Sequence, residues 1–373
     1  MNILMCLNYF TPHVSGLTRY AELVARGLAE DNQVTVLTGQ HDRQLPQRES
    51  DGEVTIIRTK LWFSLHKGYV SPQLLTEFYR LARDVDVVYL HLPLAEAWLV
   101  VSLLPKATPL VVSFHCWPQV TGGVVDRLAL GFAKAGMTRC FQRASNIIVN
   151  SVDYAESLPA LAKFFDKLIP IPPPSTEFQS PIKPRLRCEQ SGNVRVGFLG
   201  RFATEKGISV LLQAVPEVIA RNPRTRFVFA GDYRRVRGGA SYDRIKEQLA
   251  ALDSHIELAG ALDESEICSF LDSLDLLVLP SINSYESFGM VQVEAMKRGV
   301  PVVASDLPGV RVPVQLTGQG RLAVPGDAGS LAQAILSQLR TPSCRAETAK
   351  RAVEHFGNEQ LMTRFKQAIK IAT

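Results

Sequence analysis

"SYESFGMVQVEAMKRGVPVV", residues 284–303, combines a short helix pattern with the buried-strand pattern that follows it. Good helix formers run from Met290 to Arg298, and Gly299 is placed as a C-terminal stop. At 100° per residue, Glu294 falls between Met290 and Val291 on a helix that is apolar nearly all round. Because a buried carboxylate is costly without a partner, the sequence predicts that Glu294 has one.

The same stretch offers an anion site, because the amides of Gly289, Met290 and Val291 would begin the helix. A helix N-terminus presents unpaired N–H groups and partial positive charge to an anion. With a diphosphate bound there, Glu294 can accept hydrogen bonds from two neighbouring hydroxyls, as a carboxylate does with a ribose diol. Glu286, just upstream, would then meet whatever lies beyond the phosphates. The alternative is that Glu294 forms a structural ion pair with a lysine or arginine, and that Glu286 is only a helix-flanking acid.

A second group of charges lies in "GRFATEKG", residues 200–207, on a loop that leads into a helix. Arg201 and Lys206 stand five positions apart, between glycines where backbone can approach a ligand closely. A planar guanidinium and a compact ammonium together suit the oxygens of a diphosphate. The alternative interpretation is a solvated turn with ordinary surface charges.

The bulk composition limits the class of protein. The chain has 373 residues, 46% of them hydrophobic and 21% charged, as expected for a soluble globular protein with two domains. The net charge of +5 favours anionic ligands or membrane surfaces in general, and nucleic acid is not an expected partner. Six scattered cysteines without ligand spacing indicate reduced thiols and a cytoplasmic protein. "MNILMCLNYFTP" predicts a first strand rather than a signal peptide, and no apolar run reaches the roughly 18 residues of a membrane-spanning helix.

Strand patterns alternate with helix patterns in both halves of the chain. The first half contains NILMCLN, QVTVLTG, VTIIRT, VDVVYLH, PLVVSFH and NIIVNS, and the second contains VRVGFLG, TRFVFAG, HIELAG, LDLLVLPS, PVVASD and RLAV. This order predicts an α/β fold with two Rossmann-like, doubly wound parallel-sheet domains that face each other across a cleft. We expect domains over residues 1–183 and 191–354, joined by the proline-rich segment 169–193, with a C-terminal helix, 355–373, packed back on the first domain.

Polar residues follow several of the predicted strands at their carboxyl ends, where open parallel sheets bind ligands. Arg201, Asp232 and the loop of Glu286 hold such positions in the second half. In the first half His115 follows "VVSF", and Gly16 lies in the loop after the first strand. These residues are therefore the candidates for a binding site.

Several motifs together resemble a known family. E-x7-E (Glu286 to Glu294) ahead of "AM" and "GVPVVAS", with "GRFATEKG" upstream, resembles the retaining glycosyltransferases of the two-domain GT-B fold. "VLPSINSYESFGMVQVEAMKRGVPVVASDLPGV" is similar to the donor-binding signature of family 4, the glycosyl transferases group 1 domain. "FTPHVSGLTRYAELVARGLAEDNQVTVLTG" resembles the N-terminal loop and first helix of the same family. The resemblance covers nearly the whole chain and is strongest to bacterial transferases that build cell-surface polysaccharides.

The resemblance implies a role for each candidate. Arg201 and Lys206 would hold the donor diphosphate and offset charge on the departing nucleoside diphosphate. Glu294 would bind the ribose hydroxyls, and Glu286 would bind sugar hydroxyls. His115 would lie against the donor sugar, the alternative being a satisfied histidine at a strand end. Backbone groups that complete the donor site would come from Gly16, Ser287, Phe288, Gly289, Met290 and Val291.

The family implies no metal and no other cofactor. Asp84-Val85-Asp86 matches the acid-x-acid motif of metal-dependent transferases of another fold, but we interpret it as a cap at the start of the buried strand "VVYLH". Transfer with retention would follow a front-face mechanism, in which the leaving diphosphate helps to deprotonate the acceptor hydroxyl on the same face of the sugar.

The sequence departs from the family pattern in three segments. Ser15-Gly16 stands where two glycines are common, and "IPIPPPST" replaces I-P-N-G-V-D. The loop "GDYRRVRGGASYD" is longer than the usual turn and carries Arg234, Arg235 and Arg237. Contact with donor phosphates or acceptor and a merely solvated loop are both open interpretations.

Two stretches of the first half mix apolar residues with cations and are candidates for acceptor binding. They are "KLWFSLHKGY", residues 60–69, and "VVDRLALGFAKAGMTRCFQRA", residues 124–144. The second predicts a helix with Arg127 and Lys134 on one side. Such a helix can lie on an anionic membrane, where a lipid-linked sugar would be presented, which extends the expected location to the inner face of the cytoplasmic membrane. The alternative is a core-packed helix with a charged, solvated face.

We therefore predict a retaining, metal-independent hexosyltransferase. Its partners would be a UDP- or GDP-sugar donor and a saccharide acceptor, lipid-linked, in cell-surface polysaccharide or glycolipid synthesis. The alternative from another class is an inactive nucleotide-sugar-binding or scaffold protein, and a nucleotide-sugar epimerase of similar fold is a further one. A dehydrogenase is disfavoured, because no strand is followed by G-x-G-x-x-G.

Overall fold

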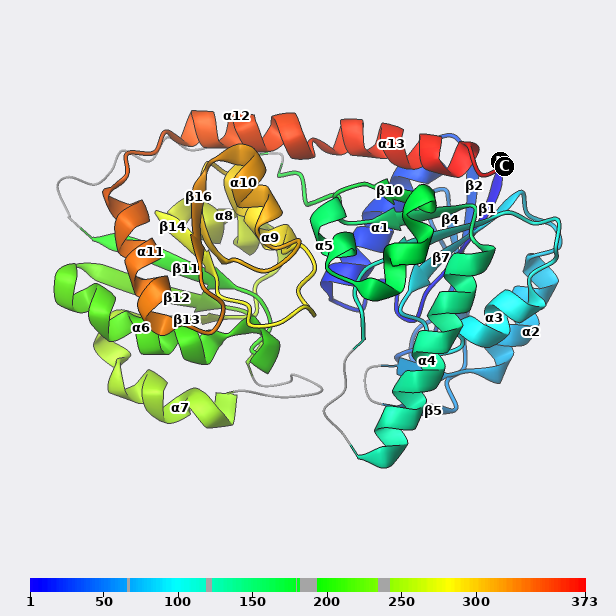
Figure 1. The fold of residues 1–373 in the computed structure, drawn as a ribbon, viewed down its shortest axis with the longest axis horizontal. Coiled ribbons are helices and arrows are strands. Elements are labelled where there is room, and N and C mark those ends of the chain that lie inside the picture. The colour runs from blue at the N-terminus through cyan, green and yellow to red at the C-terminus, as the bar shows by residue number, and fades with distance from the viewer. Residues whose placement is uncertain (66–67, 119–122, 179, 182–192, 234–241) are drawn as a thin grey trace. The chain divides into compact units, whose positions relative to one another are not determined.

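The chain forms two compact units in the computed structural model, which describes residues 1–65, 68–118, 123–178, 180–181, 193–233 and 242–373 (Figure 1). Unit 1 comprises Met1–Pro174 and Asn358–Thr373, and unit 2 comprises Ser175–Gly357. The first unit thus ends at Pro174, earlier than the boundary expected at 183. Residues just after Pro174 already contact unit 2, because the Thr176 backbone amide donates to Glu294 and Phe178 packs against the core of unit 2.

Unit 1 is built on an eight-stranded sheet in the order β10-β9-β8-β7-β1-β2-β4-β3. The pairs are parallel except β3 with β4, where an antiparallel strand closes one edge. Each strand pattern predicted in this half forms a strand, whereas the sequence missed β3, β10 and the separate β5–β6 hairpin. The strands are β1 (Asn2–Cys6), β2 (Gln33–Gly39), β3 (Arg48–Asp51), β4 (Val54–Thr59), β5 (Phe63–Leu65), β6 (Gly68–Val70), β7 (Val87–Leu92), β8 (Leu110–Phe114), β9 (Asn146–Val149) and β10 (Leu168–Pro170).

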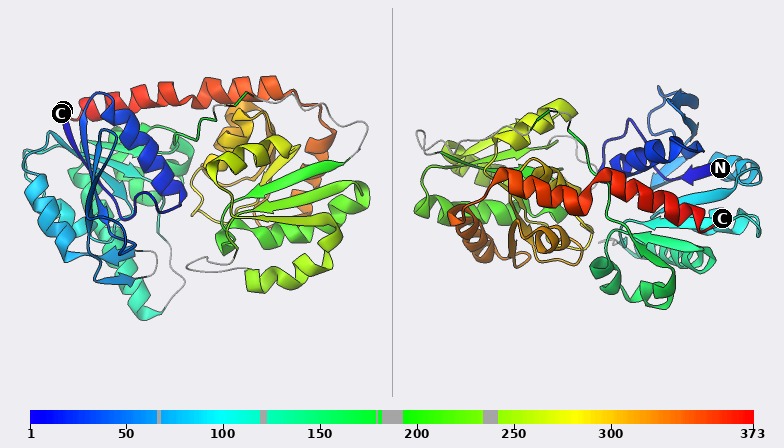
Figure 2. Two further views of the ribbon diagram at one scale, coloured as in Figure 1. Left: turned by 180° about the vertical axis from the view of Figure 1, so that it is seen from behind. Right: turned by 90° about the horizontal axis from the view of Figure 1, so that it is seen from above.

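Helices cover both faces of this sheet (Figures 1 and 2). Alternate side chains such as Val88, Leu90 and Val112 join one core with α2, α3 and α4, as expected for the period of two along a strand. On the other face lie α1 and the C-terminal helix α13, where Tyr20 and Phe365 meet edge to face at 5.8 Å. The helices are α1 (Gly16–Ala29), α2 (Pro72–Leu81), α3 (Ala97–Leu103), α4 (Val124–Arg143), α5 (Val152–Glu156) and α13 (Asn358–Lys370), with a 3-10 helix at Pro159–Lys167.

The C-terminal helix expected over 355–373 begins three residues later, as α13 (Asn358–Lys370), because residues 355 and 356 end the preceding helix. α12 (Arg345–Phe356) ends in unit 2, and α13 begins after the extended residue Gly357. α13 is held in unit 1 by a hydrogen bond of 2.7 Å from Asn146 Nδ2 to the Ala368 carbonyl, and by Lys366, which pairs with two acids at the end of α1. The chain ends meet within unit 1, where Thr373 Oγ1 is 3.9 Å from Met1 Sδ (Figure 2).

Unit 2 has a six-stranded, wholly parallel sheet in the order β13-β12-β11-β14-β15-β16. Side chains of successive strand residues alternate between two cores, so Phe227 and Phe229 face α6, α7 and α11 while Val228 and Ala230 face α8, α9 and α10. The strands are β11 (Val194–Leu199), β12 (Thr225–Ala230), β13 (Ile256–Gly260), β14 (Leu276–Leu279), β15 (Val302–Ser305) and β16 (Gly320–Ala323). The helices before α12 are α6 (Ile208–Arg221), α7 (Tyr242–Ala251), α8 (Glu264–Ser273), α9 (Met290–Lys297), α10 (Val312–Thr317) and α11 (Ala328–Arg340), with 3-10 turns at Thr204–Lys206 and Asp253–His255. All of the strand patterns predicted in this half form strands, which confirms an α/β fold with two largely parallel sheets.

Candidate active site

The loop 200–207 joins β11 to α6 at the carboxyl end of the unit 2 sheet. Gly207 ends it in the left-handed region at φ +68°, where a Cβ atom would lie 1.9 Å from the Pro280 carbonyl oxygen. The Ile282 amide donates to the Glu205 carbonyl at 3.0 Å. Only glycine permits this close approach, so Gly207 allows this loop to pack directly against the loop that follows β14.

Those two loops bring together a predicted cation and a predicted acid. Lys206 Nζ forms an ion pair with Glu286 Oε2, and the Ser281 hydroxyl donates to the same carboxylate oxygen at 3.4 Å. The two side chains are only partly buried, with 20% and 14% of their surface exposed. Arg201 is more open, with 45% of its side chain exposed and a contact of 3.3 Å to Glu205. Charge is therefore paired but still accessible to an incoming anion.

α9 begins beside this cluster, and its first turn has no side-chain cap. Gly289 holds φ +79°, and Phe288 before it is buried against Phe356. Gln292, fully buried, donates through Nε2 to the carbonyls of Phe288 and Val310, at 2.8 and 3.0 Å. Gln292 therefore ties the backbone that precedes α9 to the segment before α10. Among the described residues no side chain caps the first amides of α9, which include those of Met290 and Val291, and such amides can bind an anion.

Glu294 lies one turn further along α9 and is half-buried. The Thr176 backbone amide donates to its Oε1 at 3.3 Å. Lys297, three residues on, lies near enough that Glu294 and Glu177 partly offset the lowering of the Lys297 pKa by burial. Glu294 thus has a backbone partner that neither predicted interpretation named, and a lysine close by.

Gly16 and His115 both belong to unit 1. Gly16 is the exposed first residue of α1, whose N-terminus is closed by a capping box between Ser15 and Thr18. His115 directly follows β8 and is 7% exposed. Its Nε2 atom lies 2.9 Å from His91 Nδ1, with the two rings stacked at 5.2 Å.

A buried polar cluster surrounds this histidine pair. Ser113 Oγ is 3.0 Å from the Tyr20 hydroxyl and 2.5 Å from the Tyr89 hydroxyl. Burial lowers the pKa of His115 to about 3 and that of His91 well below its ordinary value, the second being lowered further by His115. Both rings are therefore neutral at pH 7. Sequence reasoning missed His91, although a histidine inside the apolar run "VVYLHL" was a signal for it.

The other sequence candidates have clear places in unit 1. The Asp86 carboxylate accepts a hydrogen bond of 2.7 Å from the backbone amide of Asn2, so it ties the start of β1 to that of β7. In α4, Met137, Cys140 and Phe141 are buried in the core, whereas Leu128 and Phe132 are 70% and 52% exposed. No helix among the described residues is long and apolar enough to cross a membrane. Arg234, Arg235 and Arg237 lie outside the described residues, as does part of the stretch 60–69.

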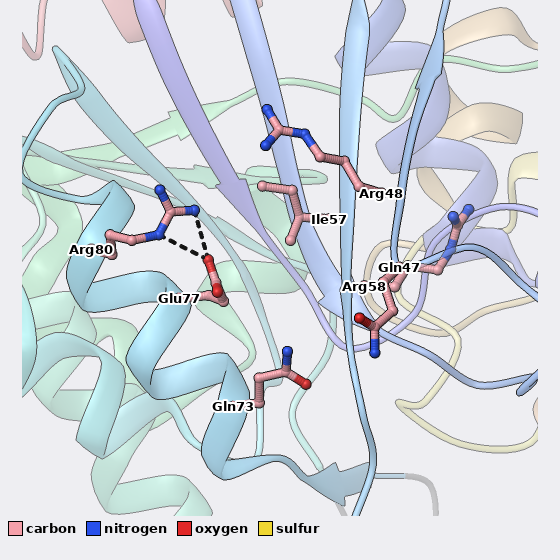
Figure 3. A pocket seen from close by; sticks show the side chains of 7 residues that line it. All are labelled: Gln47, Arg48, Ile57, Arg58, Gln73, Glu77 and Arg80. Carbon is pink, nitrogen blue, oxygen red and sulfur yellow. Dashed lines mark hydrogen bonds and ion pairs between the residues drawn. The ribbon is translucent and has the colours of Figure 1, made fainter.

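A hollow of about 170 Å³ lies elsewhere in unit 1, between β3, β4 and α2 (Figure 3). On its α2 side Arg80 pairs with Glu77. None of the predicted site residues lines it. The lining residues are Gln47, Arg48, Ile57, Arg58, Gln73, Glu77 and Arg80.

The GT-B fold consists of two α/β units, each built on a largely parallel sheet. Solved structures of that fold match the whole chain. Sucrose-phosphate synthase from Thermosynechococcus elongatus has a TM-score of 0.76 at 20% identity, covering 99% of this chain and 98% of that one. HepE from Anabaena, solved with UDP and glucose, has a TM-score of 0.72 at 19% identity and covers 99% of both chains. The protein therefore has a GT-B fold.

Sequence comparison identifies the family. Residues 14–174 match the glycosyltransferase family 4 model, and residues 188–355 match the glycosyl transferases group 1 model. Phosphatidyl-myo-inositol mannosyltransferase of Mycolicibacterium smegmatis is 30% identical over 272 residues, which are 73% of this chain and 66% of that protein. 2-Deoxystreptamine glucosyltransferase of Streptomyces kanamyceticus is 28% identical over 72% of each chain. The chain belongs to the family 4 glycosyltransferases, and its aligned part spans just under two thirds of the mannosyltransferase.

Proposed function

We propose that this protein is a retaining glycosyltransferase that moves a hexose from a UDP- or GDP-sugar to a lipid-linked saccharide acceptor, without a metal or other cofactor. The observation that carries the proposal is the convergence of Lys206, Glu286 and the uncapped N-terminus of α9 at one edge of the unit 2 sheet. A diphosphate needs fixed cations and N–H donors, and both are present there. Glycosyltransferase relatives, and a GT-B neighbour solved with UDP, support a nucleotide-sugar donor.

The ion pair suggests how the donor enters. The Lys206 ammonium has three N–H donors, so the donor diphosphate would share it with the Glu286 carboxylate. Arg201, with 45% of its side chain exposed, can turn to the same anion without losing a strong contact. A carboxylate has about four lone-pair positions, so Glu286 can keep Lys206 on one oxygen and accept sugar hydroxyls on the other. Glu294 would accept from the ribose diol.

In the proposed transfer, the bond between the anomeric carbon and the diphosphate oxygen breaks, and its electron pair leaves with the diphosphate. The acceptor hydroxyl oxygen forms the new bond on the same face of the sugar, and its proton passes to a diphosphate oxygen. Lys206, Arg201 and the α9 N-terminus offset the charge that develops on the leaving group. Such preorganised electrostatic stabilisation is usually the largest catalytic contribution.

The exposed end of α4 supports a lipid-linked acceptor presented at the inner face of the cytoplasmic membrane. Leu128 and Phe132 stand at i and i+4 on one face, and exposed Arg127 adds a cation. Sedimentation with anionic vesicles at low salt tests this part. Binding that is lost in a Leu128→Ser/Phe132→Ser double variant supports it, and no binding by the unchanged protein refutes it.

A thermal-shift titration with UDP, GDP, ADP and dTDP, in EDTA and then with magnesium, tests the donor site. A ligand that binds only the folded protein raises Tm with the logarithm of its concentration. We expect a metal-independent shift for one nucleotide, lost in Glu294→Ala and kept in Glu354→Ala, which removes an exposed glutamate of α12. No shift with any nucleotide, or an equal shift in both variants, would contradict the site.

Turnover separates the proposed activity from its alternatives. A transferase releases nucleoside diphosphate from the donor that binds, at a rate that rises with acceptor. A pure binding or scaffold protein would give saturation without release, and an epimerase would change the sugar while leaving the nucleotide attached.

A further inference from the structure

His91 and His115 meet because of the register between two parallel strands. β7 and β8 pair His91 with Ser113 and Leu92 with Phe114, so His115 follows directly after the paired segment. Tyr89, His91 and Ser113 alternate with core residues of the α4 face and therefore point toward α1, where Tyr20 contacts both histidine rings. Tyr20 and Tyr89 thus pack against the histidine pair, and 7% of the His115 surface remains exposed.

Only one proton can lie between His91 Nδ1 and His115 Nε2, which are 2.9 Å apart. Each neutral imidazole carries a single N–H, so one ring donates and the other accepts. His91 Nε2 is buried and has no hydrogen-bond partner among the described residues. Among the described residues His115 Nδ1 also forms no hydrogen bond, and His115 keeps 7% of its surface exposed.

These surroundings distinguish the two arrangements. If His115 Nε2 donated, the proton of His91 would sit on its Nε2 as a buried N–H without an acceptor. If His91 Nδ1 donates, the sealed atom left without a partner among the described residues is the lone pair of His91 Nε2, and the unpartnered proton lies on His115 Nδ1, in the more exposed ring. Orphaned buried N–H groups are rare in folded proteins, so the second arrangement is favoured.

We propose that His91 is a positioning residue that donates from Nδ1 to His115 Nε2 and thereby fixes the proton of His115 on Nδ1. The hydrogen bond made by one ring nitrogen decides which nitrogen carries the proton. His115 then presents an N–H donor at the carboxyl end of β8, to an oxygen acceptor of the ligand. That this oxygen belongs to the donor sugar rests on the proposed function, whereas the tautomer does not.

Nitrogen-15 NMR of histidine-labelled protein tests the tautomer directly. Ring nitrogens with and without a proton resonate in separate regions, and the signals of the seven histidines can be assigned from single-histidine variants. We expect a protonated Nδ1 and an unprotonated Nε2 for His115 at pH 7, and a mixture of tautomers in His91→Leu. A protonated Nε2 on His115 in the unchanged protein would overturn the proposal without reference to activity.

Kinetics of two variants test the consequence. His91→Asn places an amide N–H near the position of Nδ1, whereas His91→Leu fills the space without a donor. We expect kcat/KM to fall about tenfold in His91→Leu, the factor that corresponds to one hydrogen bond, and to be largely retained in His91→Asn. Equal losses in two variants that both stay folded would mean that ring packing matters rather than the donor. If no sugar nucleotide is turned over at all, the proposed function fails and the NMR result still decides the tautomer.

Discussion

The two units hold their polar residues in opposite ways. In unit 2, Lys206 and Glu286 stay charged, paired and partly exposed, with Arg201 open to water beside them. In unit 1, His91 and His115 are 1% and 7% exposed, and burial lowers the pKa of both so that they carry no charge at neutral pH. A charge is tolerated where a partner and water remain, whereas burial favours the neutral form of the two histidines.

This difference separates two kinds of chemistry. Fixed charges near solvent can exchange one anion for another, which suits a diphosphate that binds and leaves. Neutral donors in a dry setting orient a ligand without binding bulk ions. We therefore expect substitutions in unit 2 to act through charge and substitutions in the unit 1 cluster to act through neutral hydrogen-bond donors.

Removing the charge of Lys206 should have the largest effect. Lys206→Met keeps the aliphatic chain and leaves Glu286 without its cation. We expect kcat to fall roughly 10²–10³-fold, as for other lost electrostatic stabilisers, while affinity for the bare nucleoside changes little. Turnover and nucleoside titration measure the two quantities. Lys350→Met, which removes an exposed lysine of α12 paired with Glu354, is the matched control. Equal losses in rate and in nucleoside affinity would show that Lys206 does not act on the leaving group.

A glycine pair tests how rigidly the anion site in unit 2 is built. Gly289 and Gly326 have nearly the same φ, +79° and +78°, but an added Cβ at Gly289 would meet Leu279 at 2.4 Å and Gln292 at 2.7 Å, and at Gly326 nothing within 4 Å. Gly326→Ala should therefore lose only about 1–2 kcal/mol of unfolding free energy, from left-handed backbone strain. Gly289→Ala should lose about 1–3 kcal/mol more, from overpacking, together with nucleotide affinity. Urea unfolding and nucleotide titration decide this, and equal losses in the two variants would mean that the α9 N-terminus is adaptable.

The positions of the candidate residues in unit 2 were largely predictable, because these residues are close in sequence to the strands that place them. Arg201, Lys206 and Glu286 follow buried strands, and parallel sheets bring such loops to one edge. The limits of α9 follow from glycines on either side of a helix-forming run. The helix begins at Met290 as expected and ends at Lys297, one residue before the expected end at Arg298.

The partners of these residues were less predictable, because they depend on contacts between distant segments. Thr176 reaches Glu294 across 118 positions, and no local pattern encodes that hydrogen bond. His91 meets His115 only through the register of β7 against β8, which a pattern of apolar residues does not specify when both faces of a strand are buried. Local sequence therefore predicted the elements, and tertiary packing decided which side chains touch.

Because the histidines of the unit 1 cluster are neutral, the free energy of unfolding should depend on pH. Folding lowers the pKa of His115 from 6.5 to about 3, so between these pH values His115 is protonated in the unfolded chain and neutral in the folded chain. The contribution of neutral His115 to the free energy of unfolding is complete above pH 6.5 and is lost as the pH falls toward 3. Between pH 7 and pH 5 the loss from His115 alone is about 2 kcal/mol. His91 acts in the same direction.

Urea unfolding at pH 7 and pH 5 should show a smaller difference in unfolding free energy for His115→Phe than for the unchanged protein. His355→Gln, at an exposed histidine of α12, should keep the full difference. The same difference in all three proteins would mean that His115 is protonated in the folded state, and the contrast between a charged and a neutral site would then fail.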